Sequence, residues 1–428
     1  MIQRRRQAVG LSVLAFVLSV LLIPSGLYWA HARSVERVSI LMPAPFADAS
    51  KELVRAFNQQ HQGEIHLETI RGPLETEAIS DLAISSLLLG DAPFDALLMD
   101  VTWLPKYAAA GWLVPLDRWF TAADVDALAS GAREGNRYNN SLYRWPFTAD
   151  MGLLYWRTDL MEQPPKTPEE LVQISRALQQ QKRVPWGYVW QGRQYEGLSC
   201  VFLEMIDGFG GFWMRPDKGE IGLDQPAGVK ATTWLRDLIA SGVSPQAVNN
   251  YAESEALQSF KMGDAAFMRN WPYAWAELQK PDSAVQGKVA VTTMVAEEGV
   301  SPTATLGSWG LALLQTSSHQ EATAEAIRYL TSVDSQKKLY LGYGYTPTVQ
   351  SLFLDPELMD VNPILPDLLK ALEHTKPRPQ TPLYAQFSDV LQRDLNGVLT
   401  GNQSPSNGMA EATSTSKTIL RSAGELMP

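Results

Sequence analysis

The sequence predicts an α/β protein that is large enough for two domains. Strand-like and helix-like segments alternate from residue 35 to residue 111, and they alternate again after residue 148. Such alternation favours parallel strands joined by right-handed crossover helices. The chain has 428 residues, of which 45% are hydrophobic and 19% are charged. This composition is typical of globular proteins, and the length is sufficient for two hydrophobic cores.

The net charge and the cysteine content exclude several classes of protein. The formal net charge is −10, whereas a nucleic-acid surface needs a clustered basic face, so no nucleic-acid partner is expected. The single cysteine, Cys200, cannot form an internal disulfide and belongs to no Cys-x-x-Cys metal site. Because it lies in an apolar run, we expect it to be a small buried hydrophobic residue.

Residues 1–32 have the pattern of an export signal. Three arginines precede an uncharged apolar run at 8–23, and Ala30-His31-Ala32 has the small-x-small pattern of a cleavage site. The run is shorter than the ~20 apolar residues of a spanning helix. We expect cleavage after Ala32, with a retained membrane anchor as the alternative. No cysteine lies nearby to carry a lipid, so the exported protein is expected to be soluble and periplasmic.

The first α/β unit can be divided into elements by its hydrophobic periodicity. Strands are predicted at 38–41, 65–70 and 94–100, and helices at 49–60, 75–89 and 103–110. Ligands of such sheets bind beyond the carboxyl ends of the strands. Asp48 follows the first strand and Asp100 ends the third, so each is a candidate ligand residue or a helix cap.

The rest of the chain continues the alternation and ends in helices. A kink at Pro146, within aromatic strand-like residues 137–157, is consistent with a passage from one lobe to another. The tail, residues 322–428, is predicted to be mostly helical, with a proline-rich crossing at 376–382. Further helices are predicted at 167–181, 195–206, 227–240 and 254–262, and strands at 187–190, 265–269 and 288–293; residues 305–312 hold another glycine-flanked tryptophan.

An unusual aromatic cluster lies at Asn270-Trp-Pro-Tyr-Ala-Trp275. Pro272 has no amide hydrogen, which is tolerated at the start of a helix. We therefore predict a strand that ends in a new helix, with Trp271 on the bend and Tyr273 in the first turn. Large aromatic side chains are mostly buried, but α/β proteins bind ligands at strand-to-helix switches, so both the core and the ligand-site interpretation remain open.

The sequence offers little for catalysis. His61 and His66 do not have the spacing of a helical zinc site, and no nucleophile elbow, phosphate loop or dinucleotide motif occurs. We predict no catalytic residue, metal site or cofactor, and expect a protein that is not an enzyme. Because sequence alone cannot exclude paired catalytic carboxylates, a secreted carbohydrate-active enzyme of glycoside-hydrolase type remains the alternative.

Six segments of the sequence are informative in combination. They are Leu98-Met-Asp-Val-Thr-Trp103, Asp150-Met-Gly-Leu-Leu-Tyr-Trp-Arg157, Val189-Trp-Gln-Gly-Arg-Gln-Tyr-Glu-Gly197, Ala265-Ala-Phe-Met-Arg-Asn-Trp-Pro-Tyr-Ala-Trp275, Thr305-Leu-Gly-Ser-Trp309 and Arg378-Pro-Gln-Thr-Pro-Leu-Tyr384. Together they resemble the extracellular solute-binding proteins (family 1) of ABC sugar importers, most closely the trehalose/maltose-binding group. The resemblance runs from about Val38 to the last helix. It implies a two-lobed periplasmic-binding-protein fold (type II, maltose-binding-protein-like) with a ligand cleft between the lobes.

The resemblance also implies domain boundaries and residue roles. The N-terminal lobe would comprise 36–147 and 311–377, and the C-terminal lobe 148–310 and 378–428. The implied site residues are Asp100 and Asp150 on sugar hydroxyls, Trp271, Tyr273 and Trp309 on sugar faces, and Arg378 from the hinge side. Two positions depart from related proteins: Asp48 stands where they have Glu, and Gly307-Ser-Trp309 where they often have Gly-Gly-Trp. The departures leave the identity of the sugar open.

The function implied by the resemblance agrees with the chemistry of these residues. A carboxylate accepts hydrogen bonds from adjacent hydroxyls, and an indole covers the apolar face of a sugar. We expect a monomer that captures a neutral disaccharide or glycosyl polyol and delivers it to ABC transporter permease subunits in the inner membrane. Trehalose, maltose, sucrose and glucosylglycerol all fit. The other notable aromatic residues are expected to be packing: Trp103, Trp112 and Trp119 in the first lobe, and Trp190 and Tyr195 in the second.

Overall fold

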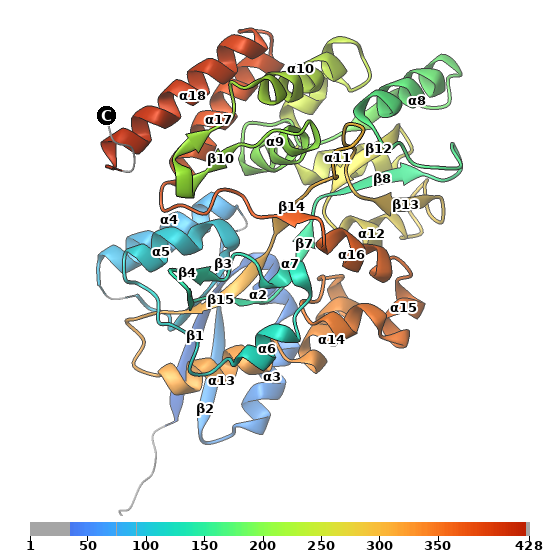
Figure 1. The fold of residues 1–428 in the computed structure, drawn as a ribbon. Helices are drawn as coiled ribbons and strands as arrows, with labels where there is room; N and C mark the ends of the chain where they lie inside the picture. Colours follow the sequence, from blue (N-terminus) through green and yellow to red (C-terminus); the bar gives the residue numbers. More distant parts are fainter. Residues whose placement is uncertain (1–34, 74, 91, 425–428) are drawn as a thin grey trace, which may run out of the picture.

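The computed structural model describes residues 35–73, 75–90 and 92–424, which form two lobes joined by a small three-stranded sheet (Figure 1). The predicted export segment, residues 1–32, lies outside these ranges. Within them, no helix has both the length and the apolar character needed to cross a membrane.

The first lobe is built on a five-stranded sheet with the order β2-β1-β3-β15-β6. Strand β1 is parallel to β2 and β3, so the predicted parallel unit is confirmed. Strand β15, from much later in the chain, is antiparallel to β3 and β6 and makes the sheet mixed. The bounds are β1 Glu36–Pro43, β2 Ile65–Gly72, β3 Ala96–Asp100, β6 Trp145–Pro146 and β15 Trp309–Leu313.

Helices cover both faces of this sheet because side chains alternate along each strand. Ile40 of β1 belongs to the core cluster that contains Phe57 of α3 (Lys51–Gln60). The next residue, Leu41, belongs to the opposite cluster with Ile79 of α4 (Thr76–Leu88) and Tyr107 of α5 (Leu104–Ala109). Helix α13 (Gln320–Leu330) packs beside α3. The central strand β3 is therefore buried on both faces, whereas the edge strand β2 keeps exposed residues.

The second lobe contains a four-stranded sheet of order β13-β8-β12-β9. Strand β12 is antiparallel to β8 and parallel to β9. Its helices include α17 and α18, which pack against each other and against α10 at the top of Figure 1. The bounds are β8 Leu153–Arg157, β9 Trp186–Val189, β12 Ala265–Asn270, β13 Val289–Thr292, α8 Pro168–Gln180, α9 Glu196–Gly208, α10 Pro226–Ala240, α11 Glu253–Lys261, α12 Ala274–Leu278, α17 Tyr384–Leu399 and α18 Pro405–Ser422.

A third sheet, of order β16-β14-β7, lies between the lobes; its strands are β7 (Asp150–Met151), β14 (Ala304–Gly307) and β16 (Thr375–Lys376). The glycine-flanked tryptophan segment 305–312 contributes to two strands: the chain forms β14, leaves it at Ser308 and continues as β15 in the first sheet. Ser308 is fully buried, and its carbonyl accepts the amide of Val101 at 3.0 Å. One residue therefore separates a joining strand from a strand of the first lobe.

The segment predicted as one helix from residue 49 contains parts of two helices, and the first of them begins earlier. Helix α2 spans Ala44–Ala49, and α3 follows after Ser50. The sequence analysis missed α2 because prolines stand at its start. A first helical turn tolerates proline, since the amides of that turn have no partner within the helix. Asp48 therefore lies in the last turn of α2 and is not the cap ahead of a helix.

The remaining short elements surround the two lobes. They are η1 Val101–Trp103, α6 Ala122–Asp126, α7 Ser130–Arg133, β4 Arg137–Tyr138, β5 Ser141–Leu142, β10 Met214–Arg215, η2 Pro216–Lys218, β11 Glu220–Ile221, η3 Gln246–Asn250, α14 Val333–Tyr343, η4 Gln350–Leu354, α15 Pro356–Val361 and α16 Leu365–Leu372.

Several residues expected to be packing are confirmed as such. Trp190 is fully buried and donates its indole hydrogen to Ser244 Oγ at 3.1 Å, and Cys200 is buried. Trp103 is buried, while Trp112 and Trp119 are partly buried and pack against first-lobe clusters. These rings stabilise the lobes by packing, and Trp103 also lines a cavity between the lobes.

Candidate ligand-binding site

A cavity of about 220 Å³ lies between the two lobes. Trp103 and Lys106 line it from the first lobe, and Glu196, Tyr384 and Gln392 line it from the second. Several of these side chains belong to, or adjoin, the polar network at the end of β3. None of the eight predicted ligand residues, all of which the structure describes, lines this cavity; it adjoins Asp100 and Arg378 through Thr102 and Glu196, which bind them.

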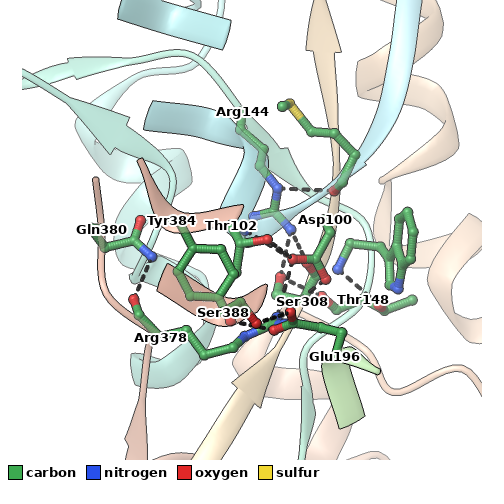
Figure 2. A network of polar contacts seen from close by, with 12 residues as sticks. Asp100, Thr102, Arg144, Thr148, Glu196, Ser308, Arg378, Gln380, Tyr384 and Ser388 are labelled. Atoms are coloured by element: carbon green, nitrogen blue, oxygen red, sulfur yellow. Dashed lines mark hydrogen bonds and ion pairs between the residues drawn. The ribbon is translucent and has the colours of Figure 1, made fainter. Parts of the chain in front are cut away.

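Arg378 joins the two lobes through a buried ionic network (Figure 2). Its Nη2 lies 3.1 and 3.2 Å from the two carboxylate oxygens of Asp100, at the end of β3. Its Nη1 lies 2.6 Å from Oε1 of Glu196, at the start of α9. Since Arg378 is only 3% exposed, both contacts are shielded from water. The network therefore fixes the end of the first-lobe sheet against a second-lobe helix.

Asp100 is a helix cap, which is one of the two roles that the sequence left open, and it is also an ionic partner of Arg378. Its role as a ligand residue stays a prediction. Its Oδ1 accepts hydrogen bonds from the backbone amide of Thr102 at 2.9 Å and from the Thr102 hydroxyl at 2.7 Å, in addition to Arg378. A carboxylate offers about four acceptor positions. A ligand hydroxyl would therefore meet Asp100 mainly at Oδ2, which it would share with Arg378.

Glu196 is a site residue that the sequence analysis missed. Besides Arg378 it accepts hydrogen bonds from the hydroxyls of Tyr384 and of Ser388, the latter at 2.7 Å. Burial raises the pKa of Glu196, and Arg378 partly offsets this rise. Its sequence signals were its place in the family-like segment 189–197 and a Glu at a helix start, the latter being common without any function. Its three partners come from residues 378–388, far away in the chain.

Arg144 is a second buried guanidinium beside this network. It donates to the carbonyl of Met99 and to Asn136 Oδ1. It also donates to both oxygens of Ser308 (Figure 2). Burial lowers the pKa of Arg144 to about 9, although Asp100 partly opposes the shift. A Cβ at Gly310 would lie 2.7 Å from the Arg144 side chain, so only glycine leaves room for it. Arg144 thus ties β3 to the Ser308 connection.

Asp150 lies on β7 and is partly buried. Its Oδ1 accepts a hydrogen bond from the Thr346 hydroxyl at 2.7 Å. Burial raises the pKa of Asp150 to about 6 despite this bond and one from Thr148. The carboxylate is therefore ionised at neutral pH and gains a proton in mildly acidic solution.

Asp150→Asn is expected to stabilise the ligand-free protein at neutral pH and to weaken ligand binding. The folded state holds the Asp150 carboxylate at a pKa above its unfolded value, so the ionised form costs stability above about pH 6. The gain in melting temperature should be largest at neutral pH and should shrink as pH falls from 6 toward 4. Thermal unfolding across this range is the measurement. A constant gain at every pH would contradict the assignment.

Trp271 stands on the predicted bend between β12 and α12, so the local structure of this stretch is confirmed. Its ring is partly buried and lies against Gly307, where an added Cβ would approach a ring carbon to 2.6 Å. Gly307 in turn pairs with Asp150 between β14 and β7. Tyr273 is the residue directly before α12, not within its first turn, and is partly buried.

Trp309 pairs with Asp100 across β15 and β3, so a carboxylate and an indole are neighbours in register. Its ring packs at 5.4 Å from the ring of Phe46 and, edge to face, at 5.6 Å from that of Trp103. The ring is partly buried. Trp309 is therefore both a candidate ligand contact and a part of the first-lobe packing.

Asp48 is held by two cations. Lys51 lies 2.8 Å and Arg71 3.1 Å from its carboxylate oxygens, and both lower its pKa. The Asp48 side chain is 40% exposed. Tyr345, which the sequence analysis missed, lies near Asp48 and Asp150, because both carboxylates contribute to the raised pKa of its hydroxyl. A ligand would have to compete with Lys51 and Arg71 for Asp48.

The predicted residues thus fall into three groups. Asp100, Arg378 and Trp309 adjoin one another at the end of the first-lobe sheet. Asp150, Gly307 and Trp271 adjoin one another on the joining sheet, with Tyr273 two residues beyond Trp271. Among the described residues, the side chains that bind Asp48 are those of Lys51 and Arg71, both of which are cationic.

Comparisons with known proteins agree with this arrangement. The family model for bacterial extracellular solute-binding proteins matches residues 43–337. A probable ABC transporter-binding protein of Deinococcus radiodurans is 34% identical over 351 residues, which are 79% of this chain and 83% of that protein. A maltotriose-binding protein of Pyrococcus abyssi is 25% identical over 314 residues, or 72% of this chain and 66% of that protein.

Solved structures show the same similarity in three dimensions. Maltose-bound MalE3 of T. maritima superposes with a TM-score of 0.82 and 31% identity, covering 90% of this chain and 100% of that one. A solute-binding protein of Agrobacterium radiobacter in complex with ribitol has a TM-score of 0.80 and 25% identity, covering 90% of this chain and 98% of that one. The two-lobed fold predicted from the sequence is confirmed.

Proposed function

This chain belongs to the bacterial extracellular solute-binding proteins and is the substrate-binding component of an ABC sugar importer, and we propose that it captures a neutral disaccharide or glycosyl polyol. The family binds solutes and does not catalyse reactions, so the alternative of a carbohydrate-active enzyme is wrong. Trehalose, maltose, sucrose and glucosylglycerol are the proposed ligand types. The ligand would be held by closure of the lobes and passed to the permease subunits.

The observation that carries this proposal is that two carboxylates lie next to partly exposed tryptophan rings, or next to residues that contact such rings, between the lobes. Asp100 faces Trp309 across two strands, and Asp150 lies beside the residue that supports Trp271. Sugars present hydroxyl rims to acceptors and apolar faces to aromatic rings. The names of the relatives support the same class, since maltotriose, maltose and ribitol are neutral polyhydroxy compounds.

We further propose that residues 1–32 direct export to the periplasm and that the protein acts there as a monomer. We propose lobe boundaries at residues 147, 310 and 377: residue 147 follows β6 and residue 377 follows β16, whereas residue 310 lies inside β15. An extracellular family and an export-type leader support this location.

The affinity for the proposed ligand is expected to change little between low and physiological salt. Asp100, Asp150 and Glu196 outnumber Arg378 and Arg144 in the site, so a sugar phosphate or uronate would be repelled, whereas a neutral sugar has no charge to screen. Calorimetric titration of the four sugars at two ionic strengths is the test. Tight binding of a phosphorylated sugar, or a steep dependence on salt, would overturn the proposed ligand class.

The radius of gyration is expected to fall when the right sugar binds. Two lobes joined by a few crossing segments close by hinge motion around a ligand. Small-angle scattering of the protein with and without saturating sugar measures the change. Addition of a non-binding sugar is the control, and an identical profile at saturation would rule out closure.

A further inference from the structure

The indole ring of Trp271 is in contact with its own protein on three sides. Its Nε1–H donates to Oε1 of Glu253 at 3.1 Å. The guanidinium carbon of Arg269 lies 4.0 Å from the ring centroid, over one face. The six-membered ring lies against Gly307. The ring is therefore hydrogen-bonded at its edge by Glu253, covered on one face by Arg269 and limited in its movement by Gly307.

The backbone of Trp271 is fixed as firmly as its ring. Its carbonyl accepts a hydrogen bond from the Tyr155 hydroxyl at 2.8 Å, and its amide donates to Asn270 Oδ1 at 2.9 Å. The Asn270 side-chain amide donates in turn to the carbonyl oxygen of Glu253 at 3.1 Å. Glu253 thus reaches Trp271 twice, once through its side chain and once through Asn270.

The support behind the ring is a fully buried ion pair. Arg269 and Glu204 are both 0% exposed and form two hydrogen bonds, at 3.0 and 2.5 Å. An apolar pair of similar volume is often as stable as a buried ion pair, so folding alone gives a weak reason for this one. Glu204 Oε1 also accepts the amide of Thr305, on β14, at 3.2 Å. The pair therefore links the back of the Trp271 ring to the strand that carries Gly307.

We propose that Glu253 and the Arg269–Glu204 pair are positioning residues that hold the Trp271 ring in its ligand-binding orientation before the ligand arrives. This inference rests on the proposed function, because it takes Trp271 to be a sugar platform. A side chain that is already ordered loses little freedom on binding, so preorganisation raises affinity without contact with the ligand. The sequence singled out neither Glu253 nor Glu204, and Arg269, although it lies in the quoted segment 265–275, is 65 positions from its partner Glu204.

Fluorine NMR of fluorotryptophan-labelled protein tests the orientation of the ring without any sugar. The Trp271 signal is identified by its loss in Trp271→Phe. We expect one sharp signal in the unsubstituted protein and a similar one in Glu253→Gln, which keeps an acceptor for the indole. Glu253→Leu should shift and broaden the signal. A Trp271 signal unchanged by Glu253→Leu overturns the proposal.

Binding of the sugar with the largest thermal shift among the four proposed ligands gives the second readout. Glu253→Leu should weaken it by about two- to tenfold, the factor expected when one side chain must be ordered on binding, and Glu253→Gln by less. Glu255→Leu is the matched control, because Glu255 caps the same helix through the Ala252 amide, at 2.9 Å. Equal losses of affinity in Glu255→Leu and Glu253→Leu would show that Glu253 only stabilises α11.

The ion pair is tested by the double variant Arg269→Met/Glu204→Met, which leaves no unpaired buried charge. It should disturb the fluorine signal of Trp271 even where circular dichroism shows an intact fold. An undisturbed signal would remove the pair from the proposal. Trp271→Ala could bind sugar normally while Glu253→Leu still shifts the fluorine signal of Trp271. In that case Trp271 is not a sugar contact, but Glu253 does position its ring.

Discussion

Trp271→Ala is expected to weaken sugar binding by roughly 30- to 150-fold, about 2–3 kcal/mol, while the melting temperature changes little. The indole offers a large apolar face to a ligand, and a well-supported ring near the centre of a site is a typical binding hot spot. The partly buried ring stands on a bend beside the lobe boundary, so its removal leaves no closed core cavity. Calorimetry and thermal unfolding of the same variant measure the two effects.

Trp190→Ala is the matched control for Trp271→Ala. Trp190 is fully buried in the second lobe, so its truncation should cost about 3–5 kcal/mol of unfolding free energy. A similar loss of stability in Trp271→Ala, with binding retained, would place Trp271 in the core. The sequence alone predicts the same low cost in stability for Trp309→Ala. Because Trp309 packs on Phe46 and Trp103, the structure predicts losses of both stability and binding.

Arg378→Met is expected to lower the unfolding free energy by about 3–5 kcal/mol and to abolish binding. The substitution leaves Asp100 and Glu196 buried without their shared cation. The triple variant Arg378→Met/Asp100→Asn/Glu196→Gln removes the unpaired charges and should recover most of the stability but not the binding. Denaturant unfolding of the single and triple variants measures the difference. A triple variant as unstable as the single one would contradict this explanation.

The deficit of Arg378→Met should also depend on pH. Burial already raises the pKa of Glu196, and loss of Arg378 removes the main group that opposes the rise. A carboxyl with a raised folded pKa costs stability while it is ionised, so the deficit should shrink as pH falls toward 5. Unfolding of the variant at about pH 7.5 and about pH 5 tests the sign.

Local sequence patterns predicted the elements and two candidate site residues that lie at their ends. The alternation before residue 111 placed β3, and with it Asp100 at the carboxyl end of a strand. Pro272 placed the bend that carries Trp271. Both inferences use neighbours in the chain, which is the information that periodicity and proline geometry contain.

What the sequence could not predict depends on partners far apart in the chain. Strand β15 pairs with β3, and Glu196 pairs with Arg378, although in each case the partners are more than a hundred positions apart in the chain. Arg144 lies near Asp100, which is on a different element. Nothing in the neighbourhood of Glu196 distinguishes it from an ordinary first-turn acid. The early start of α2 was missed for a local reason, because its prolines are the same residues that end helices elsewhere.

The short connection through Ser308 also restricts how this protein could acquire a new ligand by substitution. Gly307 touches the Trp271 ring and Gly310 touches Arg144, so a side chain at either glycine collides unless its neighbour changes first. To replace Gly307 with a larger residue, evolution must first replace Trp271, and to replace Gly310 it must first replace Arg144. Laboratory libraries that vary residues 307–310 alone should therefore yield mostly inactive proteins, and productive libraries must vary the glycines and their neighbours together.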